Sequence, residues 1–282
     1  RLVLPALAGD FRVLAPDLVG FGHSERPPAI EYGLTTWADQ IVGLLDTLGV
    51  ERAHIVGNSF GGAIALRLLR EGWNVSAGLR AGGDAPDWLE RAGAHRDRVH
   101  LADYDAADPG AARPWVAAAR ERFGAVDTII ANAGVMIPRS VIEAEDADLQ
   151  TMFDINVQAP RRLAQAAWSD LCAHGAGRVI ILSSISGKRV KSAYAASYAV
   201  TKFGATALAH ALRREGFEHG VRATAVCPGF VATDMGRTFS DYPPEKMTDP
   251  EDLARIIALL VSLPNEASVA EFVVNCQMEE SF

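Results

Sequence analysis

The sequence has little positive charge and no apolar run long enough to cross a membrane. Of its 282 residues, 27 are Lys or Arg and 35 are Asp or Glu, which gives a formal net charge of −8 at pH 7. An acidic protein is not attracted to phosphate-rich surfaces, so the charge argues against nucleic acid or an anionic membrane as the main partner. The apolar stretch at residues 1–10 is too short to span a bilayer.

Cysteine is also scarce. Cys172, Cys227 and Cys276 lie far apart and form no C-x-x-C pair. This spacing is typical of reduced thiols in a cytoplasmic protein rather than of a disulfide framework or a zinc site. We therefore expect a cytoplasmic location and no metal.

Apolar runs alternate with helical patterns along the chain, which predicts parallel βαβ units. One of the helical patterns runs from Ala63 to Glu71 and is stopped by Gly72, and the clusters at 81–86 and 242–245 are typical of loops. Strands are expected at residues 11–15, 54–56, 74–79, 99–102, 128–131, 179–182, 224–227 and 271–274.

Tyr198 and Lys202 are four residues apart in a segment that reads as the start of a helix. That spacing places both side chains on one helical face. A free tyrosine titrates near about 10, and a cation one turn away favours the phenolate and lowers the pKa toward the useful range. The pair therefore predicts a proton-transfer site.

Other polar residues follow the expected strands directly. Asn132-Ala133-Gly134 follows residues 128–131, Ser184 follows residues 179–182, and Pro228-Gly229 follows residues 224–227. Ligands collect at the carboxyl ends of the strands in an open parallel sheet, so these positions predict a binding site near Tyr198.

From about residue 63 to near the C-terminus, the chain resembles a short-chain dehydrogenase/reductase. The resemblance rests on Asn132-Ala133-Gly134, Asn156, Ser184, Tyr198-xxx-Lys202 and Pro228-Gly229, which occur in the family's order. It implies a Rossmann-like doubly wound parallel sheet with three α/β/α layers. It also implies an enzyme that interconverts a small-molecule alcohol and a carbonyl, as a homo-oligomer in many family members.

The resemblance also implies the role of each site residue. Tyr198 would exchange a proton with the substrate oxygen, and Ser184 would hydrogen-bond that oxygen. Lys202 would hold the nicotinamide ribose and bias Tyr198, while Asn156 would anchor a proton-relay water. Thr233 would touch the carboxamide.

The cofactor implied by the resemblance is a nicotinamide dinucleotide. Asp105 matches the family's adenine-contacting aspartate. Arg80 follows the strand at 74–79, where an NAD-specific protein would place an acid, and it could pair with a 2′-phosphate, so NADP is favoured over NAD. The remaining cofactor contacts expected from the resemblance are Gly57, Gly61, Asn132, Ala133, Gly134, Tyr198, Lys202, Pro228 and Gly229.

Residues 11–24 and 53–62 are instead similar to α/β-hydrolases, most closely to those that cleave meta-ring-fission products. The turn Gly57-Asn58-Ser59-Phe60-Gly61 has the small-x-Ser-x-Gly pattern of a nucleophile elbow, with Ser59 as the nucleophile. A serine also needs a base and an oxyanion hole, and none of the later histidines has that family's context. A serine hydrolase acting on a C–C or ester bond through Ser59 is therefore the alternative function.

We accordingly expect two parts, a hydrolase-like segment at residues 1–62 and a dehydrogenase-like domain at residues 63–282, as in a chimera. The dehydrogenase family opens with TGxxxGxG, whose backbone amides meet the pyrophosphate. Here Gly57 and Gly61 keep the first two glycines, but the following helix fits the family only if two residues are missing. A fusion with an impaired cofactor loop is thus a third hypothesis. The strand at 54–56 can fill the central position of the sheet, so we expect residues 1–50 to pack at the periphery or to be poorly ordered.

Overall fold

The computed structural model describes residues 60–80 and 88–278. The chain divides into two units, Arg1–Val56 and Gly57–Phe282, and all the described residues belong to the second. The strands expected at 11–15 and 54–56, the placement of residues 1–50 and the loop at 81–86 lie outside the described residues.

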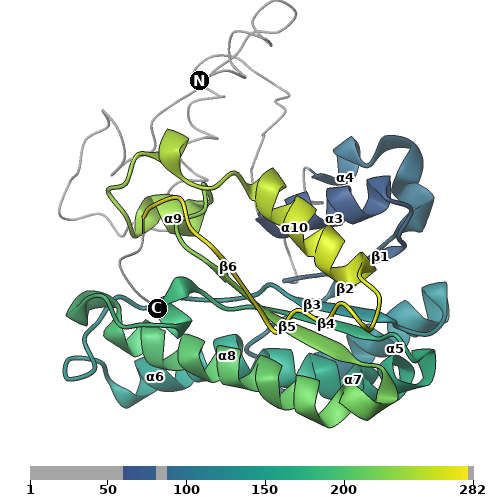
Figure 1. Ribbon diagram of the computed structural model, residues 1–282, viewed down its shortest axis with the longest axis horizontal. Coiled ribbons are helices and arrows are strands. Elements are labelled where there is room, and N and C mark those ends of the chain that lie inside the picture. The colour runs from purple at the N-terminus through teal and green to yellow at the C-terminus, as the bar shows by residue number, and fades with distance from the viewer. Residues whose placement is uncertain (1–59, 81–87, 279–282) are drawn as a thin grey trace, which may run out of the picture. The chain divides into compact units, whose positions relative to one another are not determined.

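Within the described residues, six parallel strands form two sheets (Figure 1). In the smaller sheet, β1 (Val75–Leu79) pairs with β2 (Val99–Asp103). The larger sheet has the order β3-β4-β5-β6, formed by Thr128–Ala131, Arg178–Leu182, Arg222–Pro228 and Glu271–Val274. The six strands expected in this part of the chain are confirmed, each within a residue or two of its expected bounds.

Helices cover both faces of the larger sheet (Figure 1). On one face lie α5 (Ala112–Phe123), α7 (Ala159–His174) and α8 (Ala196–Gly216), and on the other lie α3 (Phe60–Arg70) and α10 (Pro250–Ser262).

Side chains alternate between the two faces along β4. Val179 and Ile181 pack with α7 and α8, whereas Ile180 and Leu182 pack with α3 and α10. Because both faces are buried, the strand is apolar after its first residue, Arg178. The expected three-layer α/β/α arrangement is confirmed.

The remaining elements are short. They are α4 (Trp88–Arg91), α6 (Asp146–Phe153), α9 (Asp234–Thr238), a π-helical turn (Asp154–Gln158) and 3₁₀ turns at Gly93–Arg98, Ile185–Gly187, Ala193–Ala195, Phe217–His219 and Pro244–Lys246. The last turn replaces part of a predicted loop, because Pro244 is preset for the first helical position. None of the helices in residues 60–80 and 88–278 is long and apolar enough to cross a membrane.

The start of α3 differs from the prediction. The helix begins at Phe60, three residues before the expected start at Ala63, so Gly61 and Gly62 lie in its first turn. Tertiary packing favours the longer helix, because a Cβ added at Gly62 would lie only 2.6 Å from the ring of Trp88. Glycine lets this turn pack directly on α4 despite its low helix propensity.

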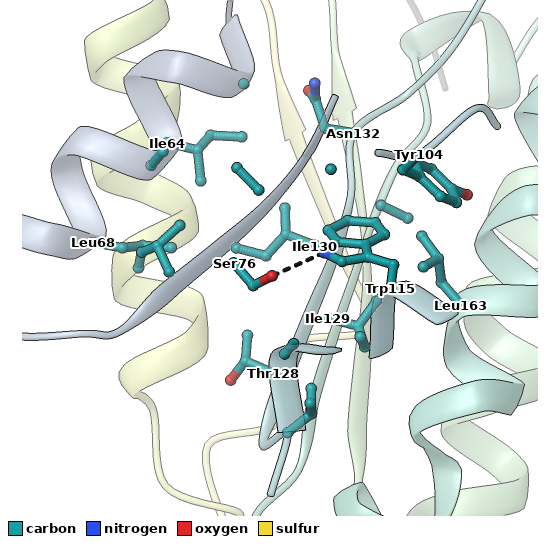
Figure 2. Close-up of a pocket in the computed structure, with 18 of the residues that line it drawn as sticks. Ile64, Leu68, Ser76, Tyr104, Trp115, Thr128, Ile129, Ile130, Asn132 and Leu163 are labelled. Carbon is teal, nitrogen blue, oxygen red and sulfur yellow. Dashed lines mark hydrogen bonds between the residues drawn. The ribbon is translucent and has the colours of Figure 1, made fainter. Parts of the chain in front are cut away.

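A cavity of about 490 Å³ is lined by both β1 and β3 (Figure 2). Trp115 of α5 lies across it and donates its Nε1–H to Ser76 Oγ at 2.8 Å. The Tyr104 ring packs beside Trp115, with 4.6 Å between the ring centroids. Within residues 60–80 and 88–278, β1 pairs only with β2, and β3 pairs only with β4. The two sheets of the described structure are therefore separated by this cavity.

Candidate active site

The first turns of α8 carry Tyr198 and Lys202 on one face, as the spacing predicts. Lys202 Nζ lies 5.6 Å from the centroid of the Tyr198 ring. The two residues are buried, with 8% and 4% of their surface exposed. A polar pair at such depth requires partners, and both residues find them at the end of β4.

Ser184 lies two residues beyond the end of β4 and caps the 3₁₀ turn Ile185–Gly187. Its Oγ accepts the Ser186 N–H at 3.1 Å. The same hydroxyl donates to the Pro228 carbonyl at 3.5 Å, and it is near enough to Tyr198 to lower the pKa of the phenol. The end of β4 thus presents one hydroxyl to the Tyr198 phenol.

Lys202 Nζ donates a hydrogen bond to the Leu182 carbonyl at 2.7 Å. Burial disfavours the charged ammonium and lowers the pKa of Lys202 to about 8. Gly134 lies close to the amine, since a Cβ added there would lie 3.3 Å from Nζ. A side chain at Gly134 would thus crowd the Lys202 amine, and glycine leaves room for the loop after β3 beside it.

The Tyr198 pKa corrects a prediction made from the sequence. We expected the neighbouring cation to lower it, but burial raises the pKa of Tyr198 to about 12, and the Ser184 hydrogen bond opposes this only in part. The physical reason is desolvation, because the phenolate loses its water when α8 packs against the sheet. Tyr198 is therefore a protonated phenol at neutral pH in the ligand-free protein.

Asn156 lies in the π-helical turn between α6 and α7 and is 1% exposed. Its Oδ1 accepts the Val135 N–H at 2.8 Å, and its Nδ2 donates to Val135 O and Thr201 Oγ1, each at 2.9 Å. Turns of π-helix are frequent at functional sites. Asn156 joins the loop after β3 to the helix that carries Tyr198.

Sequence reasoning did not identify Thr201 as a partner of this site. It is fully buried, and its Oγ1 donates to the Tyr198 carbonyl at 2.8 Å while accepting from Asn156. A threonine directly before Lys202 on the apolar side of the helix is a weak signal, since threonine often bonds to its own helix backbone. Only the packing of the two helices identifies its partner.

The predicted cofactor contacts lie at the carboxyl ends of the parallel strands. Asn132 and Ala133 follow β3, Pro228 ends β5, and Gly229 donates its N–H to Val274 O at 2.8 Å. Thr233 caps α9 through a hydrogen bond from the Gly236 N–H. Since the strands are parallel, these positions share one edge of the larger sheet.

The smaller sheet carries the two contacts expected for the adenosine half of the cofactor. Arg80 directly follows β1, and Asp105 lies two residues beyond β2. Both are exposed. Asp105 Oδ1 accepts the Ala107 N–H, which fixes the turn at this point.

The residues present fit a dinucleotide. The first turn of α3 leaves backbone N–H groups without helical acceptors and contains no acidic side chain, which suits a phosphate. A Cβ added at Gly61 would lie 3.0 Å from Asn132 Nδ2, so glycine allows α3 to approach the end of β3. Gly57 and Ser59, the other expected residues of this turn, lie outside the described residues.

Two family models match the chain. One, described as short chain dehydrogenase, matches residues 51–243, and another, described as alpha/beta hydrolase fold, matches residues 1–73. The matches overlap at residues 51–73, which include the glycine-rich turn. The expected chimera-like combination of a dehydrogenase domain and an N-terminal hydrolase segment is confirmed.

Individual relatives agree with these matches. Agropine synthesis reductase from Rhizobium rhizogenes is 35% identical over 221 residues, covering 78% of this chain and 50% of that protein. The chain therefore spans about half the length of this relative. The 2-hydroxymuconate semialdehyde hydrolase from Pseudomonas sp. (strain CF600) is 57% identical over 68 residues, which are 24% of each chain.

Among solved structures, an alcohol dehydrogenase from the archaeon Thermococcus sibiricus, complexed with 5-hydroxy-NADP, superposes with a TM-score of 0.68. It is 27% identical, and the match covers 78% of this chain and 94% of that one. The Rossmann-like fold expected from the sequence is therefore confirmed.

Proposed function

Because the chain belongs to the short chain dehydrogenase family, we propose that it is an NADP(H)-dependent oxidoreductase that interconverts an alcohol and a carbonyl group of a small molecule. The observation that carries the proposal is the convergence of three side chains: the Ser184 hydroxyl acts on the Tyr198 phenol, whose pKa it lowers, and Lys202 Nζ lies 5.6 Å from the centroid of the Tyr198 ring. These three groups meet at the carboxyl edge of the sheet, where a substrate oxygen can reach them.

Tyr198 is the proton donor in the reduction direction and the acceptor in oxidation. A pKa of about 12 keeps its phenol protonated at neutral pH, which is the form that can give a proton to a carbonyl oxygen. Ser184 holds that oxygen by a hydrogen bond. A bound nicotinamide would supply or accept the hydride.

Lys202 binds the nicotinamide ribose in this proposal. Its amine is already buried and within hydrogen-bond distance of the Leu182 carbonyl, so little movement is needed to meet a ribose hydroxyl. A pKa of about 8 leaves it largely protonated at pH 7, and the positive charge favours the Tyr198 phenolate when it forms. Asn156 anchors the water that returns the proton.

Arg80 supports NADP rather than NAD. It is exposed at the end of β1, and a guanidinium can bind a phosphate with two hydrogen bonds. The Thermococcus sibiricus alcohol dehydrogenase that superposes on this chain carries an NADP derivative. NAD remains the alternative cofactor.

Two further expectations belong to this proposal. The three cysteines are free thiols, in agreement with a reducing, cytoplasmic location. A homo-oligomer formed through α8 is supported by Val200 and Phe203, which are each 43% exposed on that helix.

The experiment that tests the proposal is titration of the protein with NADPH, followed by nicotinamide fluorescence, with NADH in parallel. Saturable micromolar binding and turnover of a carbonyl substrate are expected. Tyr198→Phe removes only the hydroxyl, so turnover should fall by roughly 10²- to 10⁴-fold while NADPH binding stays within about threefold.

Each alternative has its own outcome in the same experiment. No NADPH binding at millimolar concentration would contradict the proposal and identify a fusion with an impaired cofactor loop. Labelling of Ser59 by a fluorophosphonate probe, without NADPH binding, would support the hydrolase alternative.

A further inference from the structure

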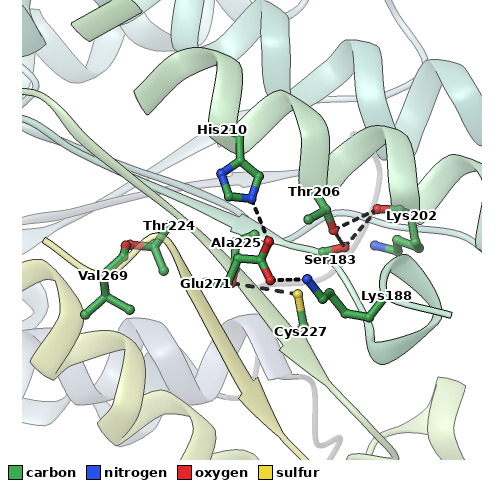
Figure 3. A network of polar contacts seen from close by, with 10 residues as sticks. All are labelled: Ser183, Lys188, Lys202, Thr206, His210, Thr224, Ala225, Cys227, Val269 and Glu271. Carbon is green, nitrogen blue, oxygen red and sulfur yellow. Dashed lines mark hydrogen bonds and ion pairs between the residues drawn. The ribbon is translucent and has the colours of Figure 1, made fainter. Parts of the chain in front are cut away.

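The end of β4 is joined to α8 by a cluster of buried hydroxyl groups (Figure 3). Ser183 Oγ donates to the Lys202 carbonyl at 3.0 Å, and Thr206 Oγ1 donates to the same oxygen at 3.1 Å. The two hydroxyl oxygens lie 2.7 Å apart. Ser183 is 4% exposed and Thr206 is 7% exposed, so water does not compete for these bonds.

We call the contacts among Ser183 Oγ, Thr206 Oγ1 and the Lys202 carbonyl oxygen the junction. The number of hydroxyl protons requires that this oxygen keeps a hydrogen bond. Ser183 and Thr206 have one hydroxyl proton each, so at most two of the three contacts are hydrogen bonds at one time. In every arrangement that uses both protons, at least one goes to the Lys202 oxygen. The Lys202 carbonyl is therefore linked to Ser183 either directly or through Thr206.

Gly187 packs on the same junction from the other side. A Cβ added there would lie 2.6 Å from Lys202 O, 2.6 Å from Ser183 Oγ and 2.7 Å from Thr206 Oγ1. All three atoms are held by the junction, so none can move aside for a methyl group. Gly187 also donates its N–H to the Ser184 carbonyl at 2.8 Å.

Ser184 is consequently held from both ends of its turn. Before it, Ser183 is fixed by its hydroxyl and by a hydrogen bond from its N–H to Val226 O at 2.8 Å. After it, Gly187 rests on the junction, and Lys188 forms an ion pair with Glu271 of β6 (Figure 3). The Ser184 hydroxyl has little freedom to leave Tyr198.

We propose that Ser183, Thr206 and Gly187 are positioning residues that set the placement of Ser184 relative to Tyr198. The inference rests on the proposed function, because it assigns the junction a role in the same reaction. Leu182, the last residue of β4, accepts from Lys202 Nζ, and Ser183, which follows it, donates to the Lys202 carbonyl. One junction thus places both Ser184 and Lys202 around the Tyr198 phenol.

Kinetic measurements on four variants test the role. Ser183→Ala and Gly187→Ala are expected to lower kcat by about ten- to a hundredfold and to leave the KM for NADPH within about twofold. Thr206→Val keeps the shape of the side chain but removes the hydroxyl, so it should lower kcat. Thr206→Ser keeps the hydroxyl and should stay within about threefold of the wild type.

Ser192→Ala is the matched control, because Ser192 is exposed in the same segment and makes no capping hydrogen bond. It should leave kcat unchanged. Equal values of kcat for Ser183→Ala and Ser192→Ala would overturn the inference. So would a loss in Thr206→Ser as large as that in Thr206→Val, because the hydroxyl would then have no special role.

Amide hydrogen exchange gives a second readout that needs no activity. The Ser186 N–H bonds to Ser184 Oγ and the Gly187 N–H bonds to Ser184 O, so both amides report the placement of Ser184. Their exchange measured by NMR should be at least about tenfold faster in Ser183→Ala than in the wild type. If the wild type reduces no carbonyl, the proposed function fails, but faster exchange still supports the junction. Unchanged exchange overturns the inference in either case.

Discussion

Replacing Lys202 by methionine should change the pH dependence of stability in a way that follows from its burial. Lys202 is 4% exposed, and its Nζ bonds to the Leu182 carbonyl. Burial lowers the pKa of this lysine from 10.5 to about 8. Lys202→Met keeps an unbranched side chain at the same place and removes the group that titrates.

The sign follows from proton linkage. Between pH 8 and pH 10.5 the unfolded chain binds more protons at Lys202 than the folded protein does, so the stability of the wild type rises with pH in this window. The difference between the two pKa values, about 2.5, corresponds to about 3.4 kcal/mol of destabilisation well below pH 8. About 1.4 kcal/mol of this remains at pH 9.5.

The wild type should therefore gain about 2 kcal/mol relative to Lys202→Met between pH 7 and pH 9.5. The lost hydrogen bond to Leu182 adds a constant difference between the two proteins, which cancels when the two pH values are compared. Groups that titrate in both proteins also cancel. The variant should have no turnover, because it lacks the amine.

Urea unfolding of both proteins at pH 7 and pH 9.5, followed by circular dichroism, measures this change. Lys191→Met, at an exposed lysine, is the control for the introduction of methionine. A stability difference between wild type and Lys202→Met that is the same at both pH values would refute the reasoning. A relative loss of wild-type stability at the higher pH would refute it as well.

Two further predictions concern the cofactor and the backbone. Arg80→Ala should weaken NADPH binding by about tenfold or more and leave NADH binding within about twofold, as measured by fluorescence titration. Equal losses for both cofactors would contradict a role of Arg80 in binding the 2′-phosphate. Gly220→Ala should destabilise the protein more than Gly124→Ala by at least about 1 kcal/mol in urea unfolding. Both glycines have positive φ, but a Cβ at Gly220 would lie 1.9 Å from Gly175 O, whereas a Cβ at Gly124 would have no atom within 4 Å. Equal losses of stability in the two variants would show that the clash with Gly175 O has no effect.

Much of the fold in the described residues could be predicted because strand patterns are local. The run at 128–131 is apolar and β-branched, and it forms β3 with the predicted bounds. The start of α3 could not be predicted in the same way. Its first turn includes Gly61 and Gly62, which are weak helix formers, and the turn is stabilised by packing on Trp88, a residue more than twenty positions away.

The candidate site could likewise be predicted in part, where its features are local along the chain. The four-residue spacing of Tyr198 and Lys202 predicted a shared helical face, since helix geometry alone determines it. The direction of the Tyr198 pKa was predicted wrongly, because a charge four residues away can be seen in the sequence but desolvation cannot. Burial depends on how α8 packs against β4 and β5, and here it is the largest cause of the shift and raises the pKa.

By itself, the sequence determined the parallel βαβ order, the polar residues at the strand ends and the chimera-like join, because each depends on residues close together along the chain. Which of those residues touch follows from the folded structure. Ser183, Gly187 and Thr206 have no common pattern in the sequence, yet they meet at one carbonyl oxygen. That meeting requires a strand end and a helix to pack within hydrogen-bond distance, and such packing results from the burial of the whole apolar core.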